Sequence, residues 1–110
     1  MDTKTYNYYQ KKKILITGGA GYLAWALVTL LNDLDCQIVR LDHKQPIDIP
    51  ERKSAKLIDL AGDVSIKETW EEALTGIDIV FHFAAQTDIY VANENPLNDL
   101  SQNILPMVWL

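Results

Sequence analysis

Short, continuous apolar runs recur along this chain, and each is followed by a polar or glycine-rich segment. Residues 14–17 form such a run and lead directly into Gly18 and Gly19, which is typical of a buried parallel strand before a tight turn. Similar runs predict three more strands, at residues 37–41, 56–59 and 77–83, the last being the most apolar. The sequence therefore predicts four short strands.

Between the first and the second of these strands, the hydrophobic period becomes helical. From Gly21 onward a stripe of leucines is expected to face the core: Leu23, Leu27, Leu30, Leu31 and Leu34. Trp25 lies off this stripe, so we expect its large side chain to be exposed to solvent.

Two further helices are predicted from the signals at their ends. Ser65 and Glu68 match a capping box, so a helix is expected to begin at Ser65 and to stop at Gly76. Asn95 and Pro96 are typical of an N-cap followed by proline at the first helical position. They predict a last helix that runs towards the end of the chain.

Strands that alternate with helices in this way predict an α/β fold whose parallel sheet has right-handed crossovers. The expected fold class is a Rossmann-type doubly wound parallel sheet, truncated after about four strands in the order 3-2-1-4. Residues 1–12 are expected to be a polar tail. In this order, strand four is an edge strand.

A glycine-rich turn at residues 17–24 joins the first predicted strand to the first predicted helix. Gly18 permits the tight turn, Gly21 lets the backbone approach a pyrophosphate, and the small Ala24 lets the helix lie close to the sheet. The free N–H groups at Tyr22 and Leu23 would face the phosphates. Residues 13–110 are therefore expected to form part of an NAD(P)-binding domain, with a merely structural glycine turn as the alternative.

Asp42 stands at the end of the second predicted strand, close to the position of the acid that binds an adenosine ribose. A carboxylate there accepts a hydrogen bond from the ribose 2′-OH and repels a 2′-phosphate, which favours NAD over NADP. His43 and Lys44 follow directly and could soften that repulsion. The alternative is a solvated aspartate with no ligand.

Composition narrows the function classes. The chain has 110 residues and a net charge of −5, which suit one domain or part of one. Its only basic run is at residues 11–13, so we expect neither nucleic acid nor membrane as a partner. Cys36 is the only cysteine, and no cluster of metal-ligating residues has ligand spacing, so no disulfide and no metal are predicted. Residues 1–10 do not match a secretion signal, and we expect a cytoplasmic protein.

Three further segments, together with the glycine turn, resemble the NAD-dependent epimerase/dehydratase family of extended short-chain dehydrogenases. Residues 62–64 resemble the family's Gly-Asp pair after strand three, and residues 82–86 resemble its strand-four signature. Asn95-Pro96 and Asn103 resemble its next helix. The similarity covers residues 13 to about 105, although Pro106 and Met107 replace the family's usual glycine-threonine pair.

The resemblance implies roles that the hydrophobic pattern does not assign. Asp63 and Val64 would hold the adenine, and the small residues after His82 would let the nicotinamide half pass close to the backbone. Together with His43, the cofactor-binding candidates that the resemblance adds are Asp63, Val64, Phe83, Ala84, Ala85, Thr87 and Asn103. His82 itself is expected to be a hydrogen-bonded core histidine.

The family's catalytic pair is a tyrosine with a lysine four residues later, on a helix after strand five. This spacing occurs here only as Tyr8 with Lys12 and Tyr9 with Lys13, both before the first strand. We interpret both as coincidence, so no catalytic residue is expected in the chain.

The predicted function is the N-terminal dinucleotide-binding part of an NAD-dependent nucleotide-sugar epimerase or dehydratase, which would transfer hydride through bound NAD. The substrate domain is expected to be absent, and the nucleotide sugar would bind the intact parent. Two alternatives stay open: a non-catalytic NAD-binding module, and an interaction piece completed by another chain. The apolar edge strand and last helix predict a homo-oligomer or a complex with the remainder of the chain.

Overall fold

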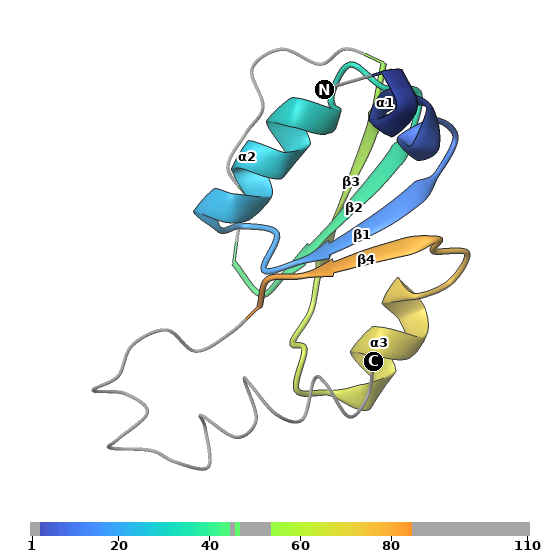
Figure 1. Cartoon of the computed structure of the whole chain (residues 1–110). Helices are drawn as coiled ribbons and strands as arrows, with labels where there is room; N and C mark the ends of the chain where they lie inside the picture. Colours follow the sequence, from blue (N-terminus) through green and yellow to red (C-terminus); the bar gives the residue numbers. More distant parts are fainter. Residues whose placement is uncertain (1–2, 45, 47–53, 85–110) are drawn as a thin grey trace.

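The computed structural model describes residues 3–44, 46 and 54–84 of the chain (Figure 1). The order of elements along the sequence is α1 (Thr3–Tyr9), β1 (Lys13–Thr17), α2 (Tyr22–Leu31), β2 (Gln37–Asp42), β3 (Lys56–Ala61), α3 (Lys67–Ala73) and β4 (Ile79–His82). The helix predicted to begin at Asn95 lies outside the described residues.

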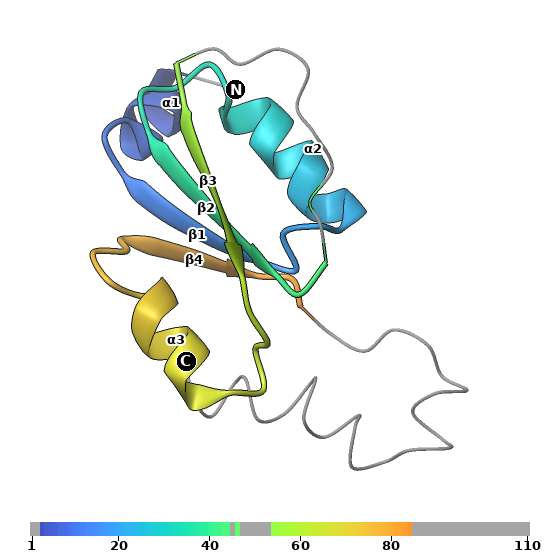
Figure 2. The same ribbon diagram turned by 180° about the vertical axis from the view of Figure 1, so that it is seen from behind.

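The four strands form one parallel sheet in the order β3-β2-β1-β4, which confirms the predicted topology. Helices α1 and α2 lie on one face of the sheet and α3 lies on the other, as the two opposite views show (Figures 1 and 2). The carboxyl ends of all four strands therefore meet at one edge, which is where doubly wound folds bind their ligands.

The face of the sheet under α2 is covered by a buried apolar cluster, and α2 contributes Ala24, Val28 and Leu31 to it. The predicted leucine stripe is wrong in part, because Leu23 and Leu30 are 67% and 63% exposed. Ala24 decides the helix face: it is small, so the backbone approaches the sheet there, and the residues one and two turns later follow it inward.

Trp25 corrects a second expectation about α2. Its side chain is half-buried, packs against the same cluster, and lies with its ring centroid 5.9 Å from that of Tyr22. Trp25 is adjacent to Ala24, so it lies at the margin of the buried face and covers that margin rather than pointing into solvent.

Cys36 is buried in the same apolar cluster under α2. Its burial, and to a lesser extent the nearby Asp35, raise the pKa of its thiol.

The opposite face is closed by α3, whose Trp70 is fully buried and donates its indole N–H to the Val64 carbonyl at 2.8 Å. The predicted N-cap is wrong, because α3 begins after Ile66. Ser65 donates both its backbone N–H and its hydroxyl to Asp63 Oδ1, at 2.9 and 2.8 Å. Gly76, with φ of +71°, turns the chain towards β4, as its predicted role as a stop requires.

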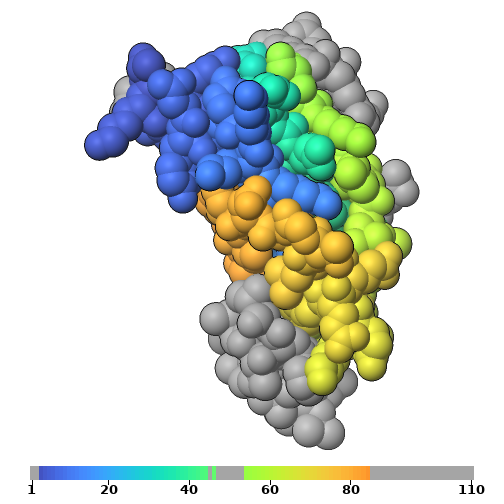
Figure 3. Space-filling view, turned by 90° about the vertical axis from the view of Figure 1, so that its right-hand side faces the viewer, coloured from blue at the N-terminus to red at the C-terminus, as the bar shows by residue number. Residues whose placement is uncertain are grey.

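The predicted N-terminal tail contains a helix. Tyr9, at the end of α1, packs against the α2-side cluster, with its ring 6.4 Å from that of Phe81 on β4. The side chain of Gln10 accepts a hydrogen bond from the Asp35 backbone N–H at 2.8 Å. A seven-residue helix is unstable alone, and these tertiary contacts, which the local sequence does not reveal, hold it in place. Figure 3 shows the blue N-terminal segment beside the orange segment around β4.

Strand β4 is the edge strand of the described sheet beside β1, and it is less buried than its apolar sequence alone would indicate. All four of its residues are only half-buried, and among the described residues it pairs with β1 alone. This agrees with the edge position that the topology predicts. Neither α1, α2 nor α3, the helices of the described residues, has the length and apolar character that a membrane span requires.

Candidate dinucleotide-binding site

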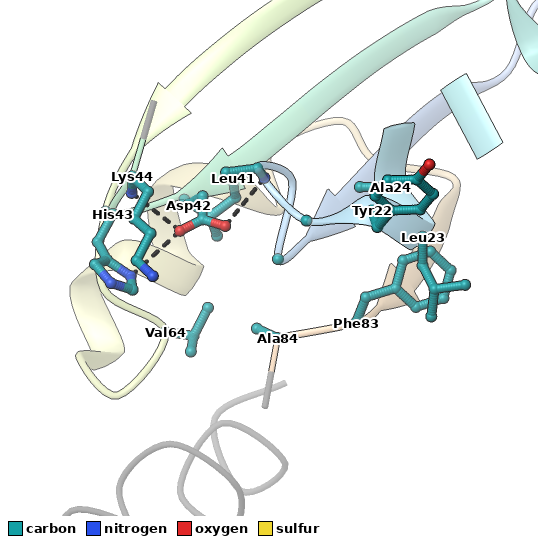
Figure 4. Close-up of a pocket in the computed structure, with 14 residues that line it drawn as sticks. Tyr22, Leu23, Ala24, Leu41, Asp42, His43, Lys44, Val64, Phe83 and Ala84 are labelled. Atoms are coloured by element: carbon teal, nitrogen blue, oxygen red, sulfur yellow. Dashed lines mark hydrogen bonds and ion pairs between the residues drawn. The ribbon is translucent and has the colours of Figure 1, made fainter. Parts of the chain in front are cut away.

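A groove of about 520 Å³ lies at the carboxyl edge of the sheet, around the β1–α2 turn (Figure 4). The predicted site residues that line it are Gly18, Gly21, Tyr22, Leu23, Asp42, His43, Val64, Phe83 and Ala84. Residues from four separate segments therefore meet in one groove.

The glycine turn forms the part of the groove nearest to β1. Gly18 has φ of +66°, and a Cβ on it would lie 2.8 Å from the Ala84 backbone nitrogen. Gly21 is the N-cap of α2, and its N–H donates to the Gly18 carbonyl at 2.9 Å. The N–H groups in the first turn of α2 have no partner within the helix, which suits an anion such as a pyrophosphate.

Asp42 lies opposite this turn, at the end of β2, with its side chain 12% exposed. Its Oδ2 accepts the Ala20 backbone N–H at 3.0 Å, and its Oδ1 accepts the Lys44 backbone N–H at 3.0 Å. His43 Nδ1 lies 3.2 Å from Oδ1 (Figure 4). Oδ2 can accept a second hydrogen bond, so the site retains capacity for a ribose hydroxyl.

Of the two residues predicted to hold the adenine, Asp63 and Val64, only Val64 lines the groove. Gly62 and Val64 line it, whereas Asp63 is not among the lining residues. The Asp63 carboxylate instead accepts the two hydrogen bonds from Ser65, which order the turn before α3. In this arrangement Asp63 shapes the wall that presents Val64.

A hydrogen-bonded triad fixes the exit of β4 beside the groove. The buried hydroxyl of Thr17 accepts the Ala84 backbone N–H at 3.3 Å and lies 2.6 Å from His82 Nδ1. The His82 ring also lies 5.6 Å from the Trp70 ring. His82 is thus hydrogen-bonded, as expected, and burial lowers its pKa, which keeps the ring neutral near pH 7.

The lowered pKa of His82 predicts a pH dependence of folding. Below about pH 6.5 the unfolded chain takes up a proton at this histidine before the folded chain does, so the free energy of unfolding falls as the pH falls. We expect this decrease to begin as the pH falls through about 6.5, the value of the unfolded chain, in urea titrations, and to be smaller in a His82→Gln variant. Equal pH slopes in the two proteins would contradict the assignment, since exposed His43 is common to both.

Sequence reasoning missed two features of the site. The first is Ala20, whose N–H donates to the Asp42 carboxylate; its position in the glycine turn was the one feature of the sequence that could have indicated this role. Gly19 was named as part of the turn, but its close contact with β2 was not foreseen. Leu41, Lys44 and Gly62 also line the groove.

The remaining predicted residues fall into two groups. Ala85, Thr87 and Asn103 lie outside the described residues. The Tyr8/Lys12 and Tyr9/Lys13 pairs lie at the amino end of β1, whose first residue is Lys13, at the opposite edge of the sheet, where Lys12 contacts the face of the Tyr8 ring. Among residues 3–44, 46 and 54–84, no group of three metal-ligating side chains occurs.

Comparison with known proteins agrees with this geometry. The model of the NAD dependent epimerase/dehydratase family matches residues 14–110. The chain belongs to this family. The resemblance seen in the sequence is thereby confirmed, and the epimerase/dehydratase match begins at β1, so helix α1 lies before it.

The chain is also similar to individual known proteins. The chain is 30% identical over 102 residues to a UDP-glucose 4-epimerase of Rickettsia akari, covering 86% of this chain and 30% of that protein. It is 34% identical over 77 residues to a 3-beta-hydroxysteroid dehydrogenase of Mycolicibacterium neoaurum, covering 70% and 20%. A structure of MoeE5 in complex with UDP-glucuronic acid and NAD has 25% identity and a TM-score of 0.71, covering 89% and 31%. The chain thus spans less than a third of each of these proteins.

Proposed function

We propose that residues 13–110 are the N-terminal dinucleotide-binding part of an NAD-dependent nucleotide-sugar epimerase or dehydratase. The observation that carries this proposal is Asp42, whose carboxylate lies in the groove opposite the Gly18–Gly21 turn. In this place it suits a ribose with a free 2′-OH and disfavours one with a 2′-phosphate. The cofactor we propose is therefore NAD.

The substrate class rests on the relatives. An epimerase and a complex with UDP-glucuronic acid and NAD both favour a nucleotide sugar for the intact protein. The steroid dehydrogenase relative matches a shorter part of the chain. We propose that the catalytic tyrosine and lysine, and most contacts to the sugar, belong to parts of the protein beyond these residues.

Exchange of Asp42 for alanine tests the cofactor. We expect Asp42→Ala to weaken NAD binding about tenfold, because the ribose loses its acceptor, and to weaken NADP binding much less, because the repulsion of its phosphate is also lost. Calorimetric titration of the full chain with both cofactors measures the two effects. Asp42→Asn is the matched control, since it keeps the size of the side chain and one acceptor for the Ala20 N–H. Equal losses for NAD and NADP in Asp42→Ala would exclude a ribose-binding role.

A turnover assay tests whether either tyrosine–lysine pair can act as a catalytic pair. We expect no reaction when the chain is incubated with NAD and a panel of UDP-, dTDP-, GDP- and CDP-sugars, because both tyrosine–lysine pairs lie at the edge of the described sheet opposite the groove. Tyr8→Phe and Tyr9→Phe variants keep the rings that pack in α1 and remove the hydroxyls. Turnover that both variants retain would reveal an active site elsewhere in the chain.

A further inference from the structure

Arg40, on β2, is a buried charged residue that does not line the groove. Its side chain is 2% exposed, and its Nε and Nη2 donate to the two carboxylate oxygens of Asp59 at 2.7 and 3.0 Å. The sheet register places Arg40 directly opposite Asp59 on β3. The pair therefore joins the carboxyl halves of β2 and β3 through two parallel hydrogen bonds.

The glycine turn rests on the main chain of this arginine. A Cβ on Gly19 would lie 2.7 Å from Arg40 Cβ and 2.9 Å from Arg40 Cα, distances that real side chains do not tolerate. Gly19 is thus in direct contact with Arg40, and no other residue type fits between them without a shift of one of the two.

Two hydrogen bonds extend this contact along β2. The Gly19 N–H donates to the Leu41 carbonyl at 3.0 Å, and the Ala20 N–H donates to Asp42 Oδ2 at 3.0 Å. Consecutive residues of the turn are therefore held by consecutive residues of β2. A change in the tilt of β2 at Arg40 would therefore move the atoms that hold the turn.

Stability alone does not explain a charge pair in this place. Arg40 is buried, but the Asp59 side chain is 38% exposed, so solvent screens the pair and its net contribution to stability is small. What the pair adds is geometry, since the planar guanidinium binds a carboxylate in one plane and at two fixed points. Lysine, or two apolar residues, would keep β2 in the sheet without fixing its orientation in this way.

We propose that Arg40, held by Asp59, is a positioning residue for the dinucleotide-binding turn. The pair sets the height and tilt of β2 where Gly19 and Ala20 rest on it, and so orders the N–H groups that would receive the pyrophosphate. The effect on cofactor affinity rests on the proposed function; the effect on the order of the turn does not.

The test uses the full chain and three variants. Arg40→Lys keeps the charge and loses the two-point geometry, and the double variant Arg40→Met/Asp59→Leu removes both charges at similar volume. Asp78→Asn is the control, since Asp78 accepts the Lys13 N–H at 2.8 Å at the opposite edge of the sheet. Thermal unfolding, amide hydrogen exchange, and titration with NAD, ADP-ribose and NMN are measured for each.

We expect amide exchange at Gly19 and Ala20 to become about tenfold faster in Arg40→Lys and in the double variant, but not in Asp78→Asn. The amide of Gln37, bonded to the Lys12 carbonyl at 2.9 Å, is the internal reference. Affinity for NAD and for ADP-ribose should fall together by about tenfold, while that for NMN, which carries only one of the two phosphates, falls less. If Arg40→Lys does not fold, the double variant decides alone.

Unchanged exchange at Gly19 and Ala20 in a folded variant would overturn the inference. It would equally fail if exchange and affinity merely followed the unfolding temperature across all variants, Asp78→Asn included. If the unaltered chain binds neither NAD nor ADP-ribose, the proposed function fails, and the exchange rates still decide whether Arg40 positions the turn.

Discussion

A valine at position 21 is expected to abolish NAD binding while the chain stays folded. Gly21 has φ of −82° and ψ of 171°, an extended conformation that valine adopts readily. A Cβ there would meet only the Gly18 carbonyl oxygen, at 3.1 Å, and is otherwise open to the groove. The side chain would therefore stand where the pyrophosphate must approach the backbone, and we expect affinity to fall at least about a hundredfold.

Fluorescence or calorimetric titration with NAD measures this loss, and urea unfolding checks the fold. Ala26→Val is the matched control, because Ala26 is on the exposed side of α2 and does not line the groove. Gly21→Ala should give an intermediate affinity. If G21V bound NAD as tightly as the parent, the pyrophosphate could not lie against this turn.

Replacing Gly18 by alanine is expected to lower the free energy of unfolding by about 3 kcal/mol, the largest stability effect that we predict for a single methyl group. Part of the loss is the left-handed backbone, with φ of +66°. The remainder is steric, because the new Cβ would lie 2.8 Å from the Ala84 nitrogen and 2.9 Å from the Phe83 carbonyl carbon. Both contacts are with backbone atoms, which cannot rotate away.

Gly76→Ala separates these two causes. Gly76 has nearly the same φ, +71°, but a Cβ on it would meet only the flexible Lys13 side chain, at 3.6 Å. Its loss should be about 1 kcal/mol, from the backbone conformation alone. Urea unfolding of both variants measures the difference, and equal losses would show that the turn yields to accommodate the Gly18 side chain.

The strand order and the glycine turn were predictable because each has a local signature. Buried parallel strands read as continuous apolar runs, and the turn needs glycines at fixed spacing. The buried face of α2 was not, because leucines lie all around that helix and periodicity cannot choose among them. Helix α1 was not predicted, because the contacts of Tyr9 and Gln10 that stabilise it are with residues far along the chain.

The candidate site divides in the same way. Gly18, Gly21 and Asp42 could be predicted from residue type and spacing, and all three line one groove in the structure. The Arg40–Asp59 pair could not be predicted in this way, because its two residues are 19 positions apart and meet only through the register of β2 with β3. A charged residue inside an apolar strand was the one available signal that such a partner exists.

The central place of β1 has a consequence for the order in which the sheet can assemble. Strand β1 is made first, and pairing with β2 needs only the α2 crossover, whereas its other edge pairs with β4, whose residues follow 65 positions later in register. During synthesis that edge stays open until residues 79–82 have left the ribosome, and the docking of Tyr9 on Phe81 must wait equally long. The β1–α2–β2 unit, with its short crossover, is therefore expected to form before the β4 side closes, since contacts between distant residues are entropically slower to make. Ribosome-bound chains stalled with residues 79–82 still inside the ribosome, and with these residues outside it, would differ in the protection of the β1 backbone.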